Sequence, residues 1–316
     1  MATADVPAFS FTWLKPRYWG LWLGFACAWL LVQLPLSWLY ALGASLGQIS
    51  GALAPYRRRV CATNIRLCFP QYTPKQQKDL VKACFRSGGI SLVETLVAWL
   101  GSEKKLNQVS FTIHGLERFD QVYENGIPSS RLLCLGFHFT TLEIIGRLLS
   151  KQTRFALFYR EHLNPVFNYF MVKSRSRYAY KTLERKDVRS LIRVLKEGVP
   201  MWYAPDQDYG RKVSVFAPFF NIPAATITTP AKMARNFGLT VLPVTYYRDE
   251  NYHYHLHIHP ALENYPSDDE VENASRINQI LEKAIVAHPE QYLWQHRRFK
   301  TRTNKIAKIY VKKKKS

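Results

Sequence analysis

A long stretch without charged residues is the first pattern along the chain. Neither acidic nor basic side chains occur between Arg17 and Arg57, and a helix that spans a bilayer needs about 20 apolar residues. We therefore expect an N-terminal transmembrane helix at residues 18–47, preceded by a short segment at residues 1–17. Pro35 marks a kink in this helix or the start of a second helical piece.

Basic residues on both sides of this stretch predict its orientation. Two cations precede it and four follow it: Lys15 and Arg17, then Arg57, Arg58, Arg59 and Arg66. Because cytoplasmic loops are rich in Lys and Arg, this bias places the rest of the chain on the cytoplasmic side. The five cysteines are odd in number and lack CxxC spacing, which suits a reducing compartment and argues against a disulfide framework.

Beyond Arg57, short apolar runs alternate with amphipathic stretches. Strands are expected at Val109–Ile113, Leu132–Phe137, Phe155–Tyr159, Pro200–Tyr203, Leu239–Tyr246 and His253–His259. Helices are expected at residues 57–68, 74–100, 142–150, 164–175, 187–197, 226–237 and 268–287. This alternation predicts an α/β domain with a mixed, largely parallel central sheet flanked by helices. We assign the domain to residues 57–304 and a basic tail to residues 305–316.

The charge balance narrows the choice of partners. Lys and Arg number 44 against 23 Asp and Glu, which gives a net charge of +21. Such a chain favours polyanions, namely nucleic acid, anionic lipid headgroups or an acidic protein. The apolar N-terminal stretch favours lipid over nucleic acid.

The stretch RLLCLGFHFTTLE places a histidine, His138, just after a buried strand. A histidine there can act as a general base, and Glu143 could be the carboxylate that orients it. Side chains five residues apart on a helix point about 140° apart, so contact requires His138 in the turn and Glu143 in the first helical turn. The alternative is a core histidine followed by a capping box from Thr140 to Glu143. Since no G-x-S-x-G elbow is present, a base here would activate a substrate hydroxyl.

Two further candidates follow other strands. Asp206 and Asp208 lie in the loop PDQDYG, and Arg160 ends the run FALFYR. The two carboxylates could bind substrate or a metal, although the other ligands of a calcium loop are missing, and the alternative is an ordinary turn. Arg160 could hold a carboxylate or phosphate; the alternative is a surface charge that closes a strand.

Two patterns near the C-terminus could bind ligands. The segment WQHRRFKTR interleaves cations with aromatic residues, so Arg297 and Arg298 could hold phosphates of a nucleic acid or, as we prefer, of a lipid headgroup. In YHYHLHIHP, alternating histidines from His253 to His259 share one face of a strand. A row on one strand cannot easily surround a tetrahedral zinc ion, so the preferred interpretation is a half-exposed strand face.

Together these stretches resemble the late acyltransferases of lipid A biosynthesis, the Kdo-lipid IVA lauroyl, myristoyl and palmitoleoyl transferases, within the lysophospholipid acyltransferase superfamily. The likeness covers nearly the whole chain and is carried by GFHFTTLE (136–143), LFYREHLNP (157–165), LERKDVRSLIRVLKEGVPMWYAPDQDYG (183–210), SVFAPFFNIPAATITT (214–229) and PEQYLWQHRRFKTR (289–302). The HxxxxE element alone is weak, whereas the ordered set is highly specific.

The resemblance implies the glycerolipid-acyltransferase α/β fold, anchored in the bacterial inner membrane by a single N-terminal helix with the catalytic domain facing the cytoplasm. It implies that His138 is the catalytic base and Glu143 its partner carboxylate, with Arg160 and Asp206 at the substrate. Many relatives carry His where this chain has Gln207, which therefore cannot titrate.

The reaction implied is transfer of a fatty acyl chain from acyl-carrier protein to the 3-hydroxyl of an acyl chain on Kdo-lipid IVA. The thioester is the acyl donor, and no metal or other cofactor is expected. The expected partners are acyl-carrier protein, the lipid acceptor and inner-membrane lipids, but not nucleic acid. The alternatives are an acyltransferase for another glycolipid or a lysophospholipid, and a non-catalytic, membrane-anchored protein that binds polyanions.

Overall fold

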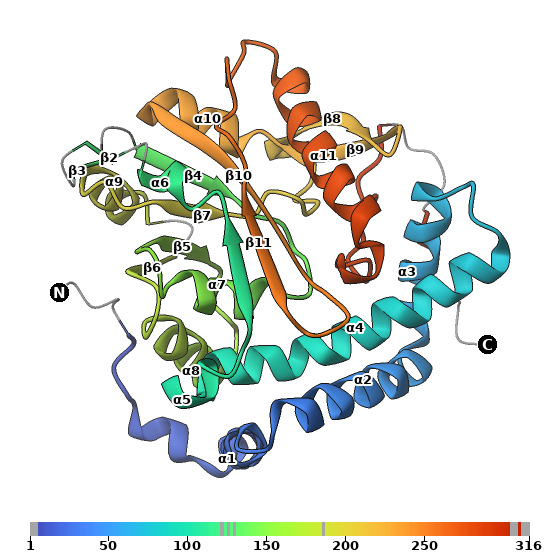
Figure 1. The fold of residues 1–316 in the computed structure, drawn as a ribbon, viewed down its shortest axis with the longest axis vertical. Helices are drawn as coiled ribbons and strands as arrows, with labels where there is room; N and C mark the ends of the chain where they lie inside the picture. The colour runs from blue at the N-terminus through green and yellow to red at the C-terminus, as the bar shows by residue number, and fades with distance from the viewer. Residues whose placement is uncertain are drawn as a thin grey trace.

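A seven-stranded sheet forms the centre of the computed structural model, which describes residues 6–120, 123–124, 127–128, 131–184, 187–303 and 309–310 (Figure 1). The strands, in spatial order, are β1 (Phe111–His114), β11 (Tyr254–Ile258), β10 (Leu239–Arg248), β4 (Arg131–Leu135), β7 (Met201–Tyr203), β5 (Ala156–Tyr159) and β6 (Lys181–Glu184). Neighbouring strands of this sheet run parallel except β10 and β11, which are antiparallel. The expected α/β fold with a mixed, largely parallel sheet is confirmed.

The central strand β4 is apolar because both of its faces are covered. Its residues from Leu132 to Leu135 are buried, the pattern of a parallel strand between two layers. In register, Leu133 lies opposite Val241 of β10 and Met201 of β7. The carboxyl ends of β4, β7 and β5 therefore meet at one edge of the sheet, where such folds bind ligands.

Eleven α-helices are found in the part of the chain that the structure describes. They are α1 (Trp19–Val32), α2 (Leu36–Leu53), α3 (Pro55–Cys68), α4 (Pro74–Leu100), α5 (Glu103–Leu106), α6 (Glu117–Asp120), α7 (Leu142–Leu149), α8 (Pro165–Arg175), α9 (Val188–Lys196), α10 (Thr229–Phe237) and α11 (Glu270–Ala287). The longest of them, α4, contacts α2, α3, α7 and α8. It begins at a capping box between Thr73 and Gln76, with Pro74 in the first turn.

Two hairpins lie outside the central sheet. They are β2–β3 (Tyr123–Glu124 and Ile127–Pro128) and β8–β9 (Ser214–Phe219 and Ile222–Ile227). The second hairpin packs on α11. Short 3-10 helices occupy Phe11–Leu14, Pro16–Tyr18, Arg211–Val213 and Pro289–Gln291.

The N-terminal stretch differs from the single helix expected at residues 18–47. It forms α1, of 14 residues, and then α2, whose N-cap is Pro35. Among the described residues, no helix combines the length and the apolar character needed to cross a membrane. The chain breaks here because proline cannot continue a helix, and 14 residues span only about 21 Å.

Helix α2 runs along α4 at very close range, as Figure 1 shows. Glycines make this approach feasible: a Cβ atom on Gly47 would lie 2.1 Å from the Phe85 carbonyl oxygen, and Gly43 and Gly89 meet at the same contact. Helix α1 packs against α4 and also against α8, where Phe25 stacks on Phe170 with ring centroids 3.8 Å apart. Both N-terminal helices therefore pack on the α/β domain.

The six predicted strands and seven predicted helices are present, with bounds that differ by a few residues. The pattern did not predict β6 or the β8–β9 hairpin. The expected basic tail lies outside the described residues except for Ile309 and Tyr310.

Candidate active site

His138 follows β4 at the edge where the carboxyl ends of the strands meet, and Asp206 follows the neighbouring strand β7. The ring nitrogen Nδ1 of His138 lies 2.6 Å from Oδ1 of Asp206, and the backbone N–H of His138 donates to Oδ2 at 3.1 Å. The Asp206 side chain is 1% exposed and that of His138 is 24% exposed. One buried carboxylate therefore holds both the ring and the backbone of this histidine.

This contact fixes the tautomer of His138. An ionised carboxylate can only accept hydrogen bonds, so Nδ1 carries the proton and donates it to Asp206. The other nitrogen, Nε2, then has a lone pair that can accept a proton. The arrangement is that of a general base with an orienting carboxylate.

The two groups alter each other's pKa. Burial alone would lower the pKa of His138, but the charge of Asp206 and its hydrogen bond outweigh burial and raise it above 6.5. Burial would raise the pKa of Asp206, but the His138 imidazolium, its hydrogen bond and its backbone N–H outweigh burial and lower it below 3.8. The pair favours an ionised carboxylate beside a strengthened base.

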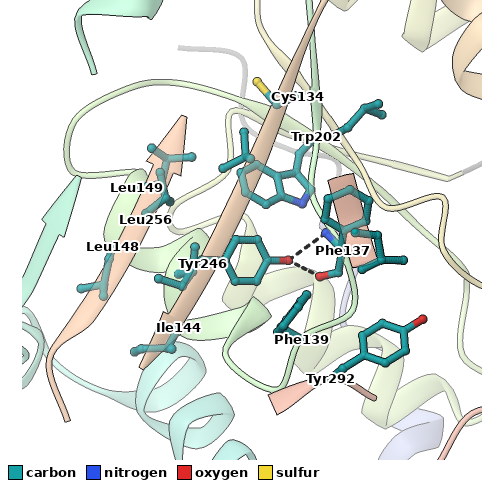
Figure 2. Packing of buried hydrophobic residues seen from close by; sticks show 14 of the residues in the cluster. Cys134, Phe137, Phe139, Ile144, Leu148, Leu149, Trp202, Tyr246, Leu256 and Tyr292 are labelled. Atoms are coloured by element: carbon teal, nitrogen blue, oxygen red, sulfur yellow. Dashed lines mark hydrogen bonds between the residues drawn. The ribbon is translucent and has the colours of Figure 1, made fainter. Parts of the chain in front are cut away.

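Buried aromatic residues hold the two residues before His138 (Figure 2). The N–H of Gly136 donates to the Tyr203 carbonyl at 3.0 Å, which continues the β4–β7 ladder. The Tyr246 hydroxyl accepts from the N–H of Phe137 at 3.2 Å and donates to the Phe137 carbonyl. A Cβ atom on Gly136 would lie 2.5 Å from the Trp202 ring, so only glycine fits there. These contacts fix the backbone direction with which the chain enters His138.

The C-terminal part of the chain holds the residues after His138. The N–H of Leu293 donates to the His138 carbonyl at 3.1 Å, and that of Thr140 donates to the Gln291 carbonyl at 2.7 Å. Between them, Phe139 forms an isolated antiparallel bridge with Tyr292. Residues 291–293 thus act as a short strand against the loop that carries the base.

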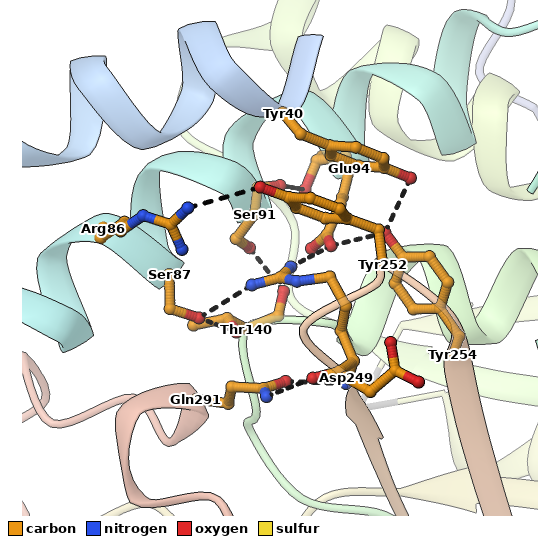
Figure 3. A network of polar contacts seen from close by, with 12 residues as sticks. Tyr40, Arg86, Ser87, Ser91, Glu94, Thr140, Asp249, Tyr252, Tyr254 and Gln291 are labelled. Atoms are coloured by element: carbon orange, nitrogen blue, oxygen red, sulfur yellow. Dashed lines mark hydrogen bonds and ion pairs between the residues drawn. The ribbon is translucent and has the colours of Figure 1, made fainter. Parts of the chain in front are cut away.

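A buried polar network continues from this loop into α4 and α2 (Figure 3). Ser87 and Ser91 of α4 bond to the Thr140 hydroxyl at 2.8 Å and to its carbonyl at 2.5 Å, respectively. Arg248 of β10 pairs with the buried Glu94 and donates to Ser87 at 3.3 Å. The network extends through Tyr254, which donates to Glu94 at 2.7 Å and lies 3.1 Å from the Tyr40 hydroxyl of α2. Buried hydrogen bonds therefore connect the loop that carries the base to α4 and β10.

Comparison with known proteins identifies the family. A family model described as bacterial lipid A biosynthesis acyltransferase matches residues 6–301. The chain is 36% identical to a lipid A biosynthesis palmitoleoyltransferase of Escherichia coli (strain K12) over 305 residues, 96% of this chain and 98% of the relative. It is also 36% identical to the lauroyltransferase of that strain over 310 residues, 97% of this chain and 99% of the relative. The chain belongs to the bacterial lipid A biosynthesis acyltransferases.

A more distant relative lies in the same family. The lipid A biosynthesis myristoyltransferase of Escherichia coli (strain K12) is 27% identical over 301 residues, 94% of this chain and 92% of the relative. The resemblance drawn from the sequence is thus confirmed, and the chain is an acyltransferase of lipid A biosynthesis.

In this acyltransferase, Glu143 is not the carboxylate that contacts the histidine, in contrast to the prediction. Its Oε2 accepts from the Trp99 indole at 2.9 Å and from the Tyr178 hydroxyl at 3.2 Å, and Oε1 pairs with Arg175. Burial would raise the pKa of Glu143, but Arg175, Trp99 and Tyr178 outweigh burial and lower it below 4.5. The capping-box alternative also fails, because the N-cap of α7 is Thr141 and makes no side-chain cap bond.

Glu143 therefore connects three helices to one another and does not contact the base. Trp99 lies in the last turn of α4, Arg175 ends α8 and Glu143 lies in the first turn of α7. The spacing of five residues turns Glu143 away from His138, whose Nδ1 is already bonded to Asp206.

Asp208, predicted to bind substrate, is instead a buried structural residue of the acyltransferase. Its carboxylate accepts from the N–H of Gly210 at 2.9 Å and from the N–H and hydroxyl of Thr301 at 2.7 and 2.8 Å. Its own N–H donates to Nε2 of His296 at 3.2 Å. These bonds fasten the loop after β7 to the C-terminal segment, and so they hold Asp206 in place.

The segment WQHRRFKTR is also mostly structural. Trp294, Phe299 and Arg298 are at most 1% exposed. Arg298 donates to the Ala225 carbonyl at 2.7 Å and to the Thr226 hydroxyl at 2.9 Å, so its guanidinium is committed to β9 and not to a substrate. The predicted substrate-binding role of Arg298 is therefore wrong.

The two remaining predicted cations are exposed. Arg160 follows β5, at the same sheet edge as His138 and Asp206, and Arg297 lies on the surface next to the buried Arg298. A substrate-binding role for Arg160 and Arg297 stays a prediction.

Sequence reasoning missed two residues that the site needs. His296 is mostly buried, and burial lowers its pKa to about 4 despite the charges of Asp206 and Asp208, so this neutral ring can accept from the Asp208 N–H. The hydroxyl of Tyr246, on β10, hydrogen-bonds to both the N–H and the carbonyl of Phe137. A single histidine within a basic run and a tyrosine within a strand carry no signal for either role.

Proposed function

We propose that the chain transfers a fatty acyl chain from acyl-carrier protein to the 3-hydroxyl of an acyl chain on Kdo-lipid IVA. The observation that carries this proposal is the His138–Asp206 pair at the carboxyl edge of the sheet, where Nε2 of a partly exposed histidine can accept a proton. The acyltransferase family, together with relatives named for lauroyl and palmitoleoyl transfer, supports this class of substrate.

The residues support a direct transfer. Nε2 of His138 takes the proton of the acceptor hydroxyl as its oxygen attacks the thioester carbonyl carbon, and the carbonyl π-electrons move to oxygen. The tetrahedral adduct then collapses, the carbon–sulfur bond breaks, and the imidazolium returns the proton to the leaving thiolate. Asp206 stabilises the imidazolium in between. An ester forms and a thioester is consumed, with no cofactor beyond the thioester donor.

The positive charge of the chain supports both proposed partners, the carrier protein and the lipid acceptor. The net charge of +21 suits an acidic carrier protein and an acceptor that bears phosphates and sugar carboxylates. Arg160 is an exposed cation that follows β5, and β5 neighbours β7, the strand that leads to Asp206. We propose that Arg160 holds an anionic group of a substrate, with Arg297 as a second contact.

We also propose that the N-terminal helices hold the enzyme on the cytoplasmic surface of the bacterial inner membrane. Most of the exposed large apolar side chains of the described residues belong to this part of the chain: Phe9, Phe11, Leu14, Trp19, Leu23, Trp29, Leu30, Trp38, Leu42, Leu46, Ile49 and Leu53. A contiguous set of exposed apolar residues is typical of a membrane or partner contact. This arrangement would bring the base to a lipid acceptor without a spanning helix.

The test is a mass-spectrometric assay of the purified full chain with Kdo-lipid IVA. Acyl-carrier proteins charged with lauroyl, myristoyl, palmitoyl or palmitoleoyl chains are supplied together. The expected result is one acyl addition by the wild type, which also identifies the preferred chain, and its loss in His138→Ala. The variant His259→Ala, which replaces the histidine just after β11, is the matched control and should keep activity.

Other outcomes reject specific parts of the proposal. If no acyl group is added from any donor, either the proposed acceptor or the proposed carrier-protein donor is wrong. The same assay with a lysophospholipid as the acceptor, or with acyl-coenzyme A as the donor, then shows which of the two is wrong. Addition that persists in His138→Ala keeps the enzyme but rejects His138 as its base.

A further inference from the structure

The outer face of the β1–β11–β10 edge carries a cluster of histidines that acyl transfer does not use. On β11, Tyr254, Leu256 and Ile258 are buried, so His255 and His257 point to the opposite face. The parallel strand β1 adds His114, which lies directly opposite His257 in the register. Two neighbouring strands thus bring three imidazoles to one face.

We propose that His114, His255 and His257 form a binding site for a divalent first-row transition metal, with zinc as the natural candidate. One ligand nitrogen from each residue lies within 4.8 Å of the other two. Three nitrogens around a tetrahedral zinc ion, each at about 2.0–2.1 Å from it, lie about 3.3 Å from one another. The nitrogens would therefore need to move closer by at most about 1.5 Å per pair.

The ring arrangement makes this movement small. The His114 and His257 rings are stacked, with centroids 4.2 Å apart and planes within 8° of parallel. His114 is exposed and the other two residues are half-buried, and the terminal torsion of a histidine side chain is broad. Rotation of the rings can therefore direct the three nitrogens to one point. The sequence-based objection to zinc fails because the third ligand comes from a second strand.

The other two histidines of the row, His253 and His259, differ from these three because their rings are hydrogen-bonded to hydroxyl groups. His253 lies 2.5 Å from the Ser110 hydroxyl and 2.8 Å from the Thr112 hydroxyl through its two ring nitrogens. Nε2 of His259 lies 2.7 Å from the Thr245 hydroxyl. Both outer histidines are committed to strand contacts, so the cluster of three is a distinct unit.

The surroundings of His255 suit a metal ligand. Its Nε2 lies 3.3 Å from Oδ2 of Asp249, so the other ring nitrogen is available to an ion. A carboxylate behind a ligating histidine fixes the ring and strengthens the ligand. Tyr247 of β10 stacks on the same ring, with the two ring centroids 4.8 Å apart.

The donor set selects the class of metal. Three imidazoles without thiolates or carboxylates suit zinc, copper or nickel rather than calcium or magnesium. Water completes the fourth position, because His114 is exposed. The ion would join β1, at the edge of the sheet, to β11. It would be structural and independent of the proposed acyl transfer, which takes place beyond β4 and β7.

The test is a titration of the metal-free full chain with zinc by calorimetry and with cobalt by visible absorption. We expect one ion per chain and cobalt bands of a tetrahedral site without a thiolate charge-transfer band. His114→Ala and His257→Gln should each weaken zinc binding at least 100-fold, and Asp249→Asn about 10- to 100-fold. His259→Gln, in the same row but outside the cluster, is the matched control and should bind as the wild type does.

Three results would overturn the proposal. They are the absence of saturable zinc binding, binding that survives the double replacement of His114 and His257, and a thiolate band that assigns the ion to cysteine. Circular dichroism of each variant checks that it is folded. Since zinc binding is measured directly, its failure is distinguishable from a failure of acyl transfer.

Discussion

Asp206 binds His138 at two points, accepting from its backbone N–H at 3.1 Å and from its ring nitrogen Nδ1 at 2.6 Å. The first contact fixes the position of the residue and the second fixes the tautomer and orientation of the ring. Glu143, five residues further along the chain, instead pairs with Arg175 at the junction of three helices. The two carboxylates therefore have separable effects on rate and on stability.

Replacement of Asp206 by Asn should lower kcat about 10²- to 10⁴-fold, the range that an oriented general base contributes. The amide can accept from the His138 backbone, but it cannot stabilise an imidazolium. Steady-state acyl transfer at fixed pH measures the effect, and an unchanged KM would show that substrate binding is intact. A variant with near wild-type kcat would contradict the assignment of Asp206 as the orienting group.

Glu143→Gln should act on stability instead. It leaves Arg175 buried without its counter-charge, at a cost of about 3–5 kcal/mol, while His138 keeps its contact with Asp206. We expect a clear fall in Tm, with kcat within tenfold of the wild type at temperatures where the variant is folded. If kcat collapses while Tm is unchanged, Glu143 belongs to the catalytic machinery after all.

The pH dependence follows from the raised pKa of His138. The base must be neutral to accept a proton, so kcat/KM should rise with pH through a value above 6.5 and then level off. In Asp206→Asn the raising charge is gone and burial remains, so the residual activity should rise at lower pH than in the wild type. If activity rises over the same pH range in the wild type and in Asp206→Asn, the pKa that controls the rate does not belong to this pair.

The same pair contributes to stability in a defined window of pH. The folded pKa of His138 is raised, so its contribution is complete below 6.5 and is lost as pH rises through the folded pKa. The folded pKa of Asp206 is lowered, so its contribution is present above 3.8 and is lost as pH falls through the folded pKa. The difference in Tm between wild type and Asp206→Asn should therefore be largest between these two values.

Arg298 and Arg297 offer a matched pair of neighbours. Arg298→Ala removes buried hydrogen bonds to Ala225 and Thr226 and should destabilise the fold by about 3 kcal/mol. Arg297→Ala, on the surface, should leave Tm nearly unchanged and raise KM if this arginine contacts substrate. Thermal unfolding and KM are measured for both. A rise in KM for Arg298→Ala without loss of stability would restore its substrate-binding role.

Gly136→Ala tests the packing before His138. The new methyl group would lie within about 3 Å of the Trp202 ring, and such overpacking costs about 1–3 kcal/mol. Displacement of the strand end should also lower kcat. Gly24→Ala is the control, since no atom lies within 4 Å of its Cβ position and alanine favours the helix. Equal effects of the two substitutions would exclude the close contact as the cause.

Membrane association can be tested on α1. The double variant Leu23→Asp and Leu30→Asp replaces two exposed side chains and should cost about 1.5–3 kcal/mol each if they are buried in lipid. Cosedimentation with anionic phospholipid vesicles should then fall at least tenfold. Leu163→Asp, at a residue that is 98% exposed outside the N-terminal helices, is the control. Binding that is insensitive to the double variant would move the membrane contact elsewhere.

Much of the fold is predictable because its signals are local. Alternating apolar runs and helical periodicity identify six strands of the central sheet, and proline and threonine mark the start of α4. The order of the strands is not local, since β4 lies between β10 and β7. The contact between His138 and Asp206 depends on that order, which explains why the sequence suggested the nearer Glu143 as the partner.

Composition also misleads where burial decides the role. A run of cations and aromatic residues predicts a binding surface, but Arg298 is buried among its hydrogen-bond partners and Trp294 is 0% exposed. The uncharged N-terminal stretch predicts one spanning helix, whereas Pro35 divides it and glycines such as Gly47 join the second half to α4. In both places tertiary packing determines the structure, and local sequence patterns carry no information about that packing.

The pairing of residues 291–293 with the His138 loop has a consequence for biosynthesis. The ribosome releases His138 and Asp206 well before it releases Gln291 and Thr301, whose hydrogen bonds complete the two loops. Because nascent chains fold from the N-terminus as segments emerge, the sheet can form while its base still lacks these contacts. Catalytic competence would then arrive only after residues 291–301 have emerged, so a nascent chain without them would not consume acyl donors.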